Sequence, residues 1–358
     1  MDPGIVRHRL SLRRPGPVYP VSMRTPTFVT LLAVTLATLV GCVPNSITLQ
    51  FDGRPTRIDE RTVARDGASR NKVAQIDLTG VITSTSTSPF GSAALLDDFS
   101  AMLDKAEKDS AVKAVLIHIN SPGGSVAASE TLAEMIETFK QRSKKPVVVS
   151  MGEVAASGGY YTAITADHIV AQPATITGSI GVIVPTINVS DGLSRLGITS
   201  RSVVSGPNKD IANPMQPANE EHMQLIQGIV DEFYQDFRSR VTSARPELKD
   251  PDTTLDGRVV TGRTALELGL VDELGGIRDA HEAAKRLAGL ESAQLVKYYR
   301  GGPPPLTPYA SASSQVKQTD QPGVLDAVLN WKDRLAMNGA TDPGFYYLWL
   351  PPGALSID

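Results

Sequence analysis

The sequence has almost no cysteine. Cys42 is the single one among 358 residues, so an intrachain disulfide is impossible. An excess of one charge is also missing, because 35 basic and 38 acidic side chains leave a formal net charge of −3. A chain so balanced has no electrostatic attraction to nucleic acid. Its length and its 41% hydrophobic content suffice for one large or two modest globular domains.

The N-terminal region lacks a hydrophobic run of membrane-spanning length. The apolar stretch from Phe28 to Val40 is shorter than the ~20 residues that a spanning helix needs, but it suits the hydrophobic region of a signal peptide. Arg24 precedes this stretch and Cys42 follows it. Residues 1–22 are too long and too rich in proline for the basic region of such a peptide, so we expect the true start at Met23. An uncleaved anchor is the alternative interpretation.

Strands and helices alternate through the middle of the chain. Alternating apolar residues predict a strand at Lys72 to Ile82, and apolar runs predict buried strands at Val112 to Ile119 and Val147 to Val149. A helical pattern follows each of them. This alternation indicates an α/β fold with largely parallel strands. Further along, we expect strands at His168 to Ala171, Ile180 to Val189 and Thr199 to Val204, and a long helix at about Asn219 to Ser243.

Two of the turns between strand and helix are rich in glycine. One contains Gly123 and Gly124, and the other contains Ser157 followed by Gly158. A serine between a buried strand and a helix N-terminus is placed like a nucleophile, and glycines let backbone N–H groups point into a cleft. Ser157 is therefore a candidate nucleophile, and the N–H groups of Gly124 and Gly158 are candidate donors to an oxyanion. A turn that only packs the helix against the sheet is the alternative.

A nucleophilic serine needs a base, and histidine is scarce. The histidines are His8, His118, His168, His222 and His281. The first is lost with the signal peptide, the second lies in the middle of a strand, and the third lies at the far end of the helix after the serine. The last two lie on helices with solvated neighbours, so no histidine is a persuasive partner. A lysine can serve instead if its pKa is lowered from its ordinary value of ~10.4.

Five short motifs lie in order between about Lys72 and Leu290. They are Asn120-Ser121-Pro122-Gly123-Gly124, Ala155-Ala156-Ser157-Gly158-Gly159-Tyr160-Tyr161, Thr177-Gly178-Ser179-Ile180-Gly181-Val182, Ser205-Gly206-Pro207-Asn208-Lys209-Asp210 and Asp256-Gly257-Arg258-Val259. Together they resemble the signal peptide peptidase A (SppA) family of Ser-Lys peptidases. The resemblance implies that Ser157 is the nucleophile and Lys209 the general base. It also implies that Ser179 holds Lys209 or relays protons with it.

The resemblance further implies a fold and a domain organisation. The expected fold is α/β, the crotonase-like β-β-α superhelix that the family shares with the Clp proteolytic subunit. One peptidase domain, residues 72–292, would follow a signal peptide (1–42) and a linker (43–71), and a Pro/Ser-rich linker and tail (293–358) would follow the domain. The family implies peptide substrates such as signal-peptide remnants, and no cofactor, metal or nucleic acid. It also implies a homo-oligomeric ring, in which one subunit can complete its neighbour's site.

The residues before the cysteine suggest how the protein is anchored. Leu39-Val40-Gly41-Cys42 resembles the lipobox of bacterial lipoproteins, in which the cysteine is lipidated and becomes the mature N-terminus. This feature stands where the family has a transmembrane anchor. We therefore expect a membrane-anchored lipoprotein on the extracytoplasmic side of a bacterial cell envelope.

Three other functions compete with the Ser-Lys peptidase. A Clp-type Ser-His-Asp protease subunit needs a histidine roughly 25 residues after the serine, where this chain has Val182. A crotonase-type acyl-CoA enzyme needs neither a nucleophilic serine nor an export signal. A non-catalytic membrane scaffold on the same fold predicts the loss of Ser157 or Lys209, and both residues are present.

The end of the chain carries an aromatic cluster, Phe345 to Leu350, although only 5% of the residues are aromatic. Six consecutive large apolar residues are not expected to stay solvated. We consider two hypotheses for this segment. It occupies the substrate cleft of its own chain, or it packs on the outer surface of the domain or on a neighbouring subunit. A further amphipathic helix is predicted at Val324 to Met337.

Overall fold

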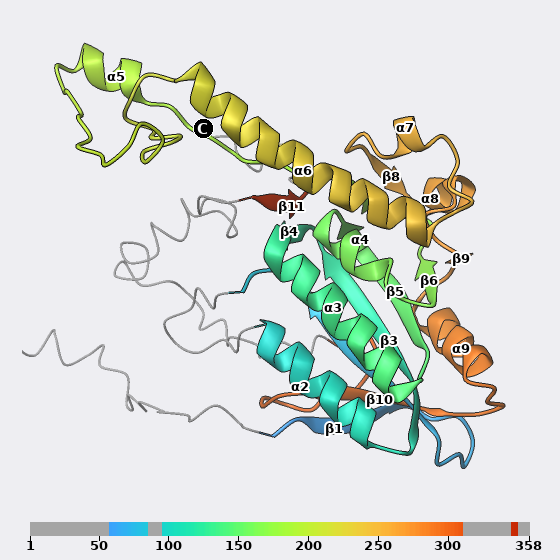
Figure 1. The fold of residues 1–358 in the computed structure, drawn as a ribbon. Coiled ribbons are helices and arrows are strands. Elements are labelled where there is room, and N and C mark those ends of the chain that lie inside the picture. The colour runs from blue at the N-terminus through green and yellow to red at the C-terminus, as the bar shows by residue number, and fades with distance from the viewer. Residues whose placement is uncertain (1–56, 85–94, 311–344, 350–358) are drawn as a thin grey trace, which may run out of the picture. The chain divides into compact units, whose positions relative to one another are not determined.

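The computed structural model describes residues 57–84, 95–310 and 345–349. The predicted signal peptide, which ends at Cys42, and the helix predicted at Val324 to Met337 lie outside these ranges. The described residues form a nine-stranded sheet in the order β1-β10-β2-β3-β5-β6-β9, which β7 and β8 extend beside β5 (Figure 1). All pairs from β10 to β9 are parallel. The bounds are β1 (Asp59–Ala64), β2 (Lys72–Thr79), β3 (Val112–Ser121), β5 (Val147–Ala156), β6 (His168–Ala171), β7 (Ile176–Gly178), β8 (Val259–Thr261), β9 (Glu273–Leu274) and β10 (Gln294–Tyr299).

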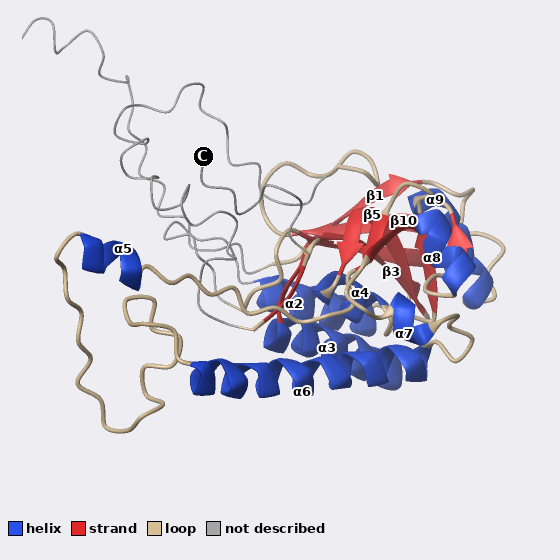
Figure 2. Ribbon diagram, turned by 90° about the horizontal axis from the view of Figure 1, so that it is seen from above, coloured by secondary structure: helices blue, strands red, loops and turns tan. Residues whose placement is uncertain are grey.

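Helices cover both faces of this sheet, with α2, α3, α4 and α6 on one face and α9 on the other (Figures 1 and 2). Along β3, Val115 and Ile117 join the larger core, whereas Ala114 and Leu116 join the smaller core with α9. Alternate side chains of β3 thus point to opposite faces, and both faces are buried. This explains why the sequence of the strand is one nearly continuous apolar run. The bounds are α2 (Leu95–Lys108), α3 (Val126–Ser143), α4 (Gly158–Ala163), α5 (Ser190–Arg195), α6 (Glu220–Ala244), α7 (Pro251–Thr254), α8 (Gly262–Leu268) and α9 (Ile277–Leu287). Among the helices in the described ranges, none combines the length and apolar character that crossing a membrane requires.

The predicted α/β layering is confirmed, but two of the expected strands are not. Ile180 to Val189 contributes only an isolated bridge at Ile183, and Thr199 to Val204 has no regular structure. These segments lie in, or lead into, residues 184–219, which leave the sheet and which we call the arm. β-branched residues favour strands only where a neighbouring strand and a buried face exist, and Val203 on the arm is fully exposed. The long helix near residue 219 is present as α6.

The sheet extends past the domain limits expected from the sequence. β1 falls within residues 43–71, which were expected as a linker or a short β-element, and β10 falls just after residue 292. β10 pairs with β2 in parallel and with β1 in antiparallel orientation. Both ends of the described core therefore belong to the same sheet.

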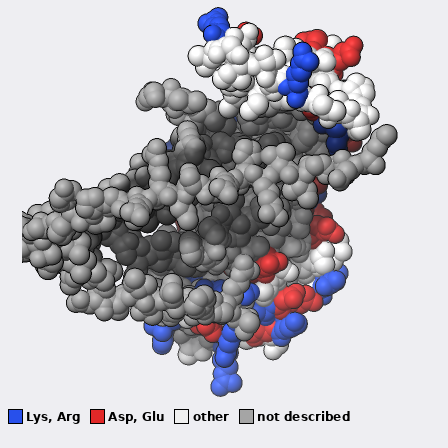
Figure 3. All heavy atoms as spheres, turned by 90° about the vertical axis from the view of Figure 1, so that its left-hand side faces the viewer, with Lys and Arg blue, Asp and Glu red and all other residues white. Residues whose placement is uncertain are grey.

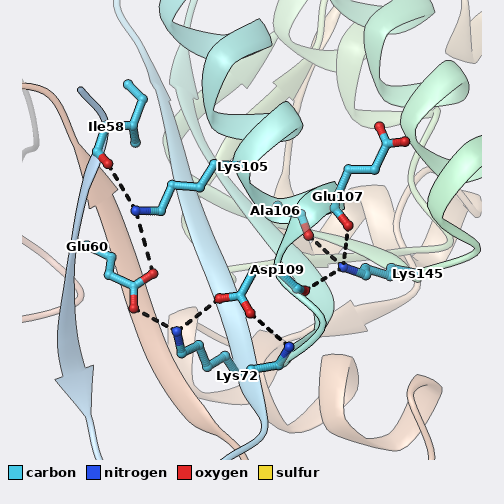
Figure 4. A network of polar contacts seen from close by, with 9 residues as sticks. Ile58, Glu60, Lys72, Lys105, Ala106, Glu107, Asp109 and Lys145 are labelled. Atoms are coloured by element: carbon cyan, nitrogen blue, oxygen red, sulfur yellow. Dashed lines mark hydrogen bonds and ion pairs between the residues drawn. The ribbon is translucent and has the colours of Figure 1, made fainter. Parts of the chain in front are cut away.

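Lys72, the first residue of β2, ties the N-terminal strands to the end of α2. Its Nζ donates hydrogen bonds to Glu60 on β1, at 2.7 Å, and to Asp109 after α2, at 2.9 Å (Figure 4). Partial burial works against the charge of Lys72, but its hydrogen bonds to the two carboxylates raise its pKa overall. The same pairing lowers the pKa of Asp109 in spite of its partial burial.

Lys145, just before β5, closes the end of α2. The last carbonyl groups of a helix have no partner within the helix. Lys145 Nζ donates to three carbonyl oxygens there, those of Ala106 at 2.6 Å, Glu107 at 3.1 Å and Asp109 at 2.8 Å (Figure 4). Burial lowers the pKa of Lys145. This one side chain therefore fixes α2 against the strand that leads to Ser157.

Replacing Lys145 should cost stability. Lys145→Met keeps the aliphatic stem but removes a donor from three carbonyls, of which that of Asp109 keeps the N–H of Val112, so we expect a loss of about 1–3 kcal/mol in the free energy of unfolding. Urea titration would measure it. Lys144→Met is the matched control, because the neighbouring Lys144 is exposed and should change stability little. Equal stabilities of the two variants would contradict this role of Lys145.

Candidate active site

Ser157 lies at the junction of β5 and α4 in a strained backbone conformation. Its φ is 53° and its ψ is −115°, a region that L-residues rarely adopt. A tight strand-to-helix turn of this kind presents a serine hydroxyl away from the strand. The residue is fully buried, and among the described residues its Oγ has no hydrogen-bond partner. A buried, unpaired hydroxyl on strained backbone is unusual in a turn that only packs a helix.

Gly124 and Gly158 approach each other beside this serine. A Cβ placed on Gly158 would lie 3.2 Å from the nitrogen of Gly124 and 2.4 Å from Ser129 Oγ. A Cβ placed on Gly123 would lie 2.8 Å from the nitrogen of Gly158. The site therefore has no room for side chains at these positions. The structure brings the two candidate donors together, and their role towards an oxyanion stays a prediction.

Ser179 lies in the segment that holds the backbone of Ser157. Gly178 accepts a 2.8 Å hydrogen bond from the N–H of Ser157, and β7 pairs with β5 at this point. Ser179 has a positive φ of 50°, and its N–H donates a 2.7 Å hydrogen bond to the backbone carbonyl of Arg258. The two serines are thus fixed on adjacent strand ends. The predicted partnership of Ser179 with Lys209 is not tested by these contacts.

Lys209 lies apart from these residues. It is exposed and belongs to the arm, which includes α5 and reaches beyond the N-terminal end of α6 (Figures 1 and 2). The arm is held by contacts within itself, such as the 2.8 Å hydrogen bond from Val189 N–H to the carbonyl of Pro214. The predicted nucleophile and base are therefore not joined within a single chain.

His168 is also directed away from Ser157. Its Nε2 lies 3.1 Å from Glu273 Oε2 on β9, and its Nδ1 lies 4.0 Å from Asp272. These contacts hold the ring at the β6–β9 edge of the sheet. They agree with the expectation from the sequence that this histidine is no partner for the serine.

A second serine lies in line with a histidine and an aspartate. Asp77, His118 and Ser150 are register partners across β2, β3 and β5. His118 Nδ1, however, lies 3.1 Å from the carbonyl of Ser150, and Asp77 is paired with Lys297 at 2.7 Å. Burial lowers the pKa of His118. This row is a polar part of the core rather than a catalytic triad.

The C-terminal strand β11 (Tyr346–Leu348) lies on β4 (Gly123–Ser125), beside the glycines of the site. The pairing is antiparallel, and Tyr347 stands opposite Gly124. The carbonyl oxygen of Tyr347 would lie 2.0 Å from a Cβ on Gly123 and 3.1 Å from one on Gly158. This carbonyl oxygen therefore lies against the backbone of Gly123 and Gly158, next to the candidate oxyanion donors. Of the two hypotheses for this segment, the geometry favours occupation of the cleft.

Comparisons with known proteins match the chain to proteases. The family model described as Peptidase family S49 matches residues 139–291, and the Clp protease model matches residues 90–179. A putative signal peptide peptidase SppA of Enterococcus faecium is 33% identical over 297 residues, which are 81% of this chain and 85% of the relative. A putative protease of Synechocystis is 35% identical over 268 residues, which are 74% and 92% of the two chains. A solved ClpP1 mutant from Listeria monocytogenes is 20% identical, with a TM-score of 0.37 over 59% of this chain and 94% of that one.

The fold and these matches define a serine protease with a Clp protease-like fold. The chain belongs to peptidase family S49, in which it resembles the relatives named SppA. It also matches protease 4 of Salmonella typhi at 38% identity, but it covers only 33% of that longer protein.

Aromatic residues beside the site were not predicted from the sequence. Tyr161 on α4 and Phe237 on α6 are buried next to Tyr347. The signal was present in α6, where Phe233 and Phe237 are four residues apart and so lie on one face of the helix. The segment was predicted as a helix, but its contact with a segment more than a hundred residues later has no local signature.

The strain at Ser157 predicts an unusual order of stability. Ser157→Gly should be more stable than Ser157→Ala by about 1 kcal/mol, because glycine adopts the observed φ and ψ at little cost. Both variants should be inactive. Ser150 is the matched control, since it lies inside β5 without a positive φ, and there glycine should be the less stable replacement. Thermal unfolding of the four variants measures both differences, and the same order at both serines would contradict strain at Ser157.

Proposed function

We propose that this protein is a serine endopeptidase that uses a Ser-Lys dyad, with Ser157 as nucleophile and Lys209 as general base. The observation that carries the proposal is the buried hydroxyl of Ser157, which stands on strained backbone and has no partner among the described residues. It lies beside Gly123 and Gly158, against which the carbonyl of Tyr347 packs. The five motifs and the family support the assignment of the base. A Ser-His-Asp mechanism has no support, because His118 and His168 are engaged elsewhere.

The chemistry follows from these positions. Lys209 Nζ, in its neutral form, accepts the proton of the Ser157 hydroxyl while Oγ attacks the substrate carbonyl carbon. The N–H groups of Gly124 and Gly158 donate hydrogen bonds to the resulting oxyanion. The protonated lysine then gives its proton to the leaving amine as the peptide bond breaks. A water molecule, deprotonated by the same lysine, hydrolyses the acyl-enzyme and restores the serine.

The dyad, in this proposal, forms between two copies of the chain. Lys209 is exposed on an arm whose apolar side chains are also exposed, among them Ile187 at 70%, Leu196 at 76% and Val203 at 103%. In Figure 3 the arm lies at the top of the view, where uncharged side chains make up most of the surface. Exposed apolar groups gathered on a projecting segment are typical of a protein–protein contact. A neighbour's arm would cover this apolar surface and bring its lysine to Ser157, and repetition of the contact would close a ring.

The substrates we propose are extended apolar peptides at a membrane, such as remnants of signal peptides. The relatives' printed names, the aromatic segment seated on β4 and the predicted lipid on Cys42 support this class together. A lipid anchor on the extracytoplasmic face would hold the cleft near such peptides. Localisation and anchoring are thus proposals that follow from the N-terminal sequence.

The lipid anchor predicts a modified N-terminus. If Cys42 is lipidated, mass spectrometry of the membrane-extracted protein should find a mature chain that begins at Cys42 with added acyl mass. Cys42→Ala should abolish the modification and release the protein from the membrane fraction. An unmodified peptide that reads through Gly41 and Cys42 would show an uncleaved anchor instead.

A dyad shared between copies predicts complementation of two inactive variants. Ser157→Ala and Lys209→Ala should each abolish peptide hydrolysis. Co-expressed in equal amounts, they should recover about one quarter of the wild-type activity, because about a quarter of the interfaces would join an intact serine to an intact lysine.

The control replaces the Lys209→Ala partner with the double variant Ser157→Ala, Lys209→Ala, and it must remain inactive. No recovery from the first mixture, in an oligomer that contains both variants, would place the dyad within one chain. Near-normal hydrolysis by Lys209→Ala alone would exclude lysine as the base. Full activity of Ser157→Ala would exclude Ser157 as the nucleophile. No hydrolysis by the wild-type protein would leave a non-catalytic scaffold as the better interpretation.

A further inference from the structure

Strand β5 bulges just before Ser157. Ile119 of β3 stands opposite Met151 of β5. The next pair joins Ser121 to Ala155, so a step of two residues on β3 corresponds to a step of four on β5. Bulges occur often next to active sites, where they redirect the strand that leads to a functional side chain. The two extra residues of β5 therefore help to decide where Ser157 lies.

β5 changes its other neighbour at the same place. Up to Met151 it pairs with β6, and from Val154 onwards it pairs with β7. Glu153, between these two stretches, is exposed, whereas Met151 is fully buried. β7 ends at Gly178, whose carbonyl accepts the N–H of Ser157 at 2.8 Å. The bulge therefore brings the end of β5 to the strand that holds the backbone of the serine.

The side chain of Asn120 on β3 fills this bulge. Its Oδ1 accepts the N–H of Val154 at 3.1 Å. In a bulge the regular ladder is interrupted, and a backbone N–H there needs a partner other than a strand carbonyl. Asn120 also packs on the backbone of Gly152, where an added Cβ would lie 3.1 Å from Asn120 Cβ and 3.3 Å from its Oδ1. Glycine at position 152 thus leaves the space that the amide occupies.

Two threonines hold the bulge from the side opposite to β3. Thr175 Oγ1 donates a 2.7 Å hydrogen bond to the carbonyl of Gly152. Thr177 Oγ1, on β7, donates a 2.6 Å hydrogen bond to the carbonyl of Ala155. Both threonines are buried. The bulge is therefore fixed by side chains on its two sides and has one defined shape.

Asn120 also belongs to the strand that leads to a candidate oxyanion donor. β3 is followed after one residue by β4, which contains Gly124. The carbonyl of Asn120 accepts the N–H of Gly80 at 3.0 Å, which fixes this end of β3 to the end of β2. The hydrogen bond between Val154 and Asn120 thus joins the backbone that leads to Ser157 to the backbone that leads to Gly124.

The two candidate donors differ in how they are tied to the nucleophile. Gly158 follows Ser157 directly, so the same turn places both residues. Gly124 comes from another strand, and its position relative to Ser157 depends on contacts between β3 and β5. Donors must lie where the oxyanion forms, and a displacement of about 1 Å can lower a rate about 100-fold. A contact that sets this distance therefore matters for the reaction.

We propose that Asn120 is a positioning residue of the active site, whose hydrogen bond to Val154 fixes the bulge of β5 and so sets Ser157 against the donor Gly124. The proposal rests on the peptidase function proposed above. It adds a side chain that acts on the reaction through the backbone and does not touch the substrate. The alternative is that Asn120 only stabilises the end of β3.

The test compares variants of the full-length protein on a quenched fluorogenic peptide rich in leucine and alanine. Asn120→Ala removes the acceptor, so kcat and kcat/KM should fall together by about 100-fold, while KM changes less than about 2-fold. Asn120→Asp keeps an oxygen acceptor and should retain a kcat within about 5-fold of the wild type. If Asn120→Ala does not fold, Asn120→Leu takes its place, because leucine keeps the volume of the side chain without the acceptor.

Asp167→Ala is the matched control. Asp167 Oδ2 accepts the N–H of Val147 at 2.8 Å, so it holds the backbone of the same strand at the other end, and Asp167 also pairs with Lys140 at 2.7 Å. This variant should lower the melting temperature at least as much as Asn120→Ala but keep kcat within about 2-fold. Equal losses of kcat in these two variants, or in Asn120→Ala and Asn120→Asp, would overturn the positioning role. An unchanged kcat in Asn120→Ala would overturn it as well.

Hydrogen exchange separates this inference from the proposed function. In Asn120→Ala the amides of residues 153–158 should exchange at least ~10-fold faster than in the wild type, whereas those of residues 147–150 should not change. Asn120→Asp should restore the protection. Unchanged exchange of residues 153–158 in Asn120→Ala would overturn the inference and leave the peptidase intact. A wild-type protein without hydrolytic activity would contradict the peptidase, and the exchange rates would then decide whether Asn120 holds the segment of Ser157.

Discussion

The site depends on the close approach of three backbone segments, which only glycine permits. β4, the start of α4 and β11 meet where Gly123, Gly124 and Gly158 have no side chains, and a single added Cβ would collide with a neighbouring backbone or hydroxyl group. This approach brings the backbone nitrogens of Gly124 and Gly158 close together. The strained turn at Ser157 then holds a hydroxyl beside that point. The absence of side chains at these three glycines is therefore what leaves room for the candidate site.

Much of the fold could be predicted because burial on both faces leaves a strong signal. The apolar residues alternate with polar ones in β2 and form near-continuous runs in β3 and β5, and helical spacing lies between the strands. The signal fails in the arm and just before it, where Ile180 to Val189 contributes only the bridge at Ile183 and Thr199 to Val204 has no regular structure. It also missed β10, because a strand that completes a sheet from the far end of the chain resembles any short apolar segment.

The site was predictable where it is local. Ser157 and its glycines lie within short motifs, so strand, turn and helix together indicated a nucleophile. Lys209 was assigned by resemblance, and its separation from the serine in one chain follows from the geometry of the arm, which no spacing reveals. The pocket of Tyr161, Phe237 and Tyr347 joins three distant segments, and only the folded chain shows it.

The position of β10 has a consequence for how the chain acquires its structure. β1 and β2 are neighbours in the sequence, yet β10 separates them in the sheet. During synthesis from the N-terminus, β2 keeps an unpaired edge and β1 has no partner until Tyr299 has emerged. The sheet therefore closes late, through contacts of long sequence separation that form slowly. A ribosome-bound fragment that ends before Gln294 would expose this edge to other chains.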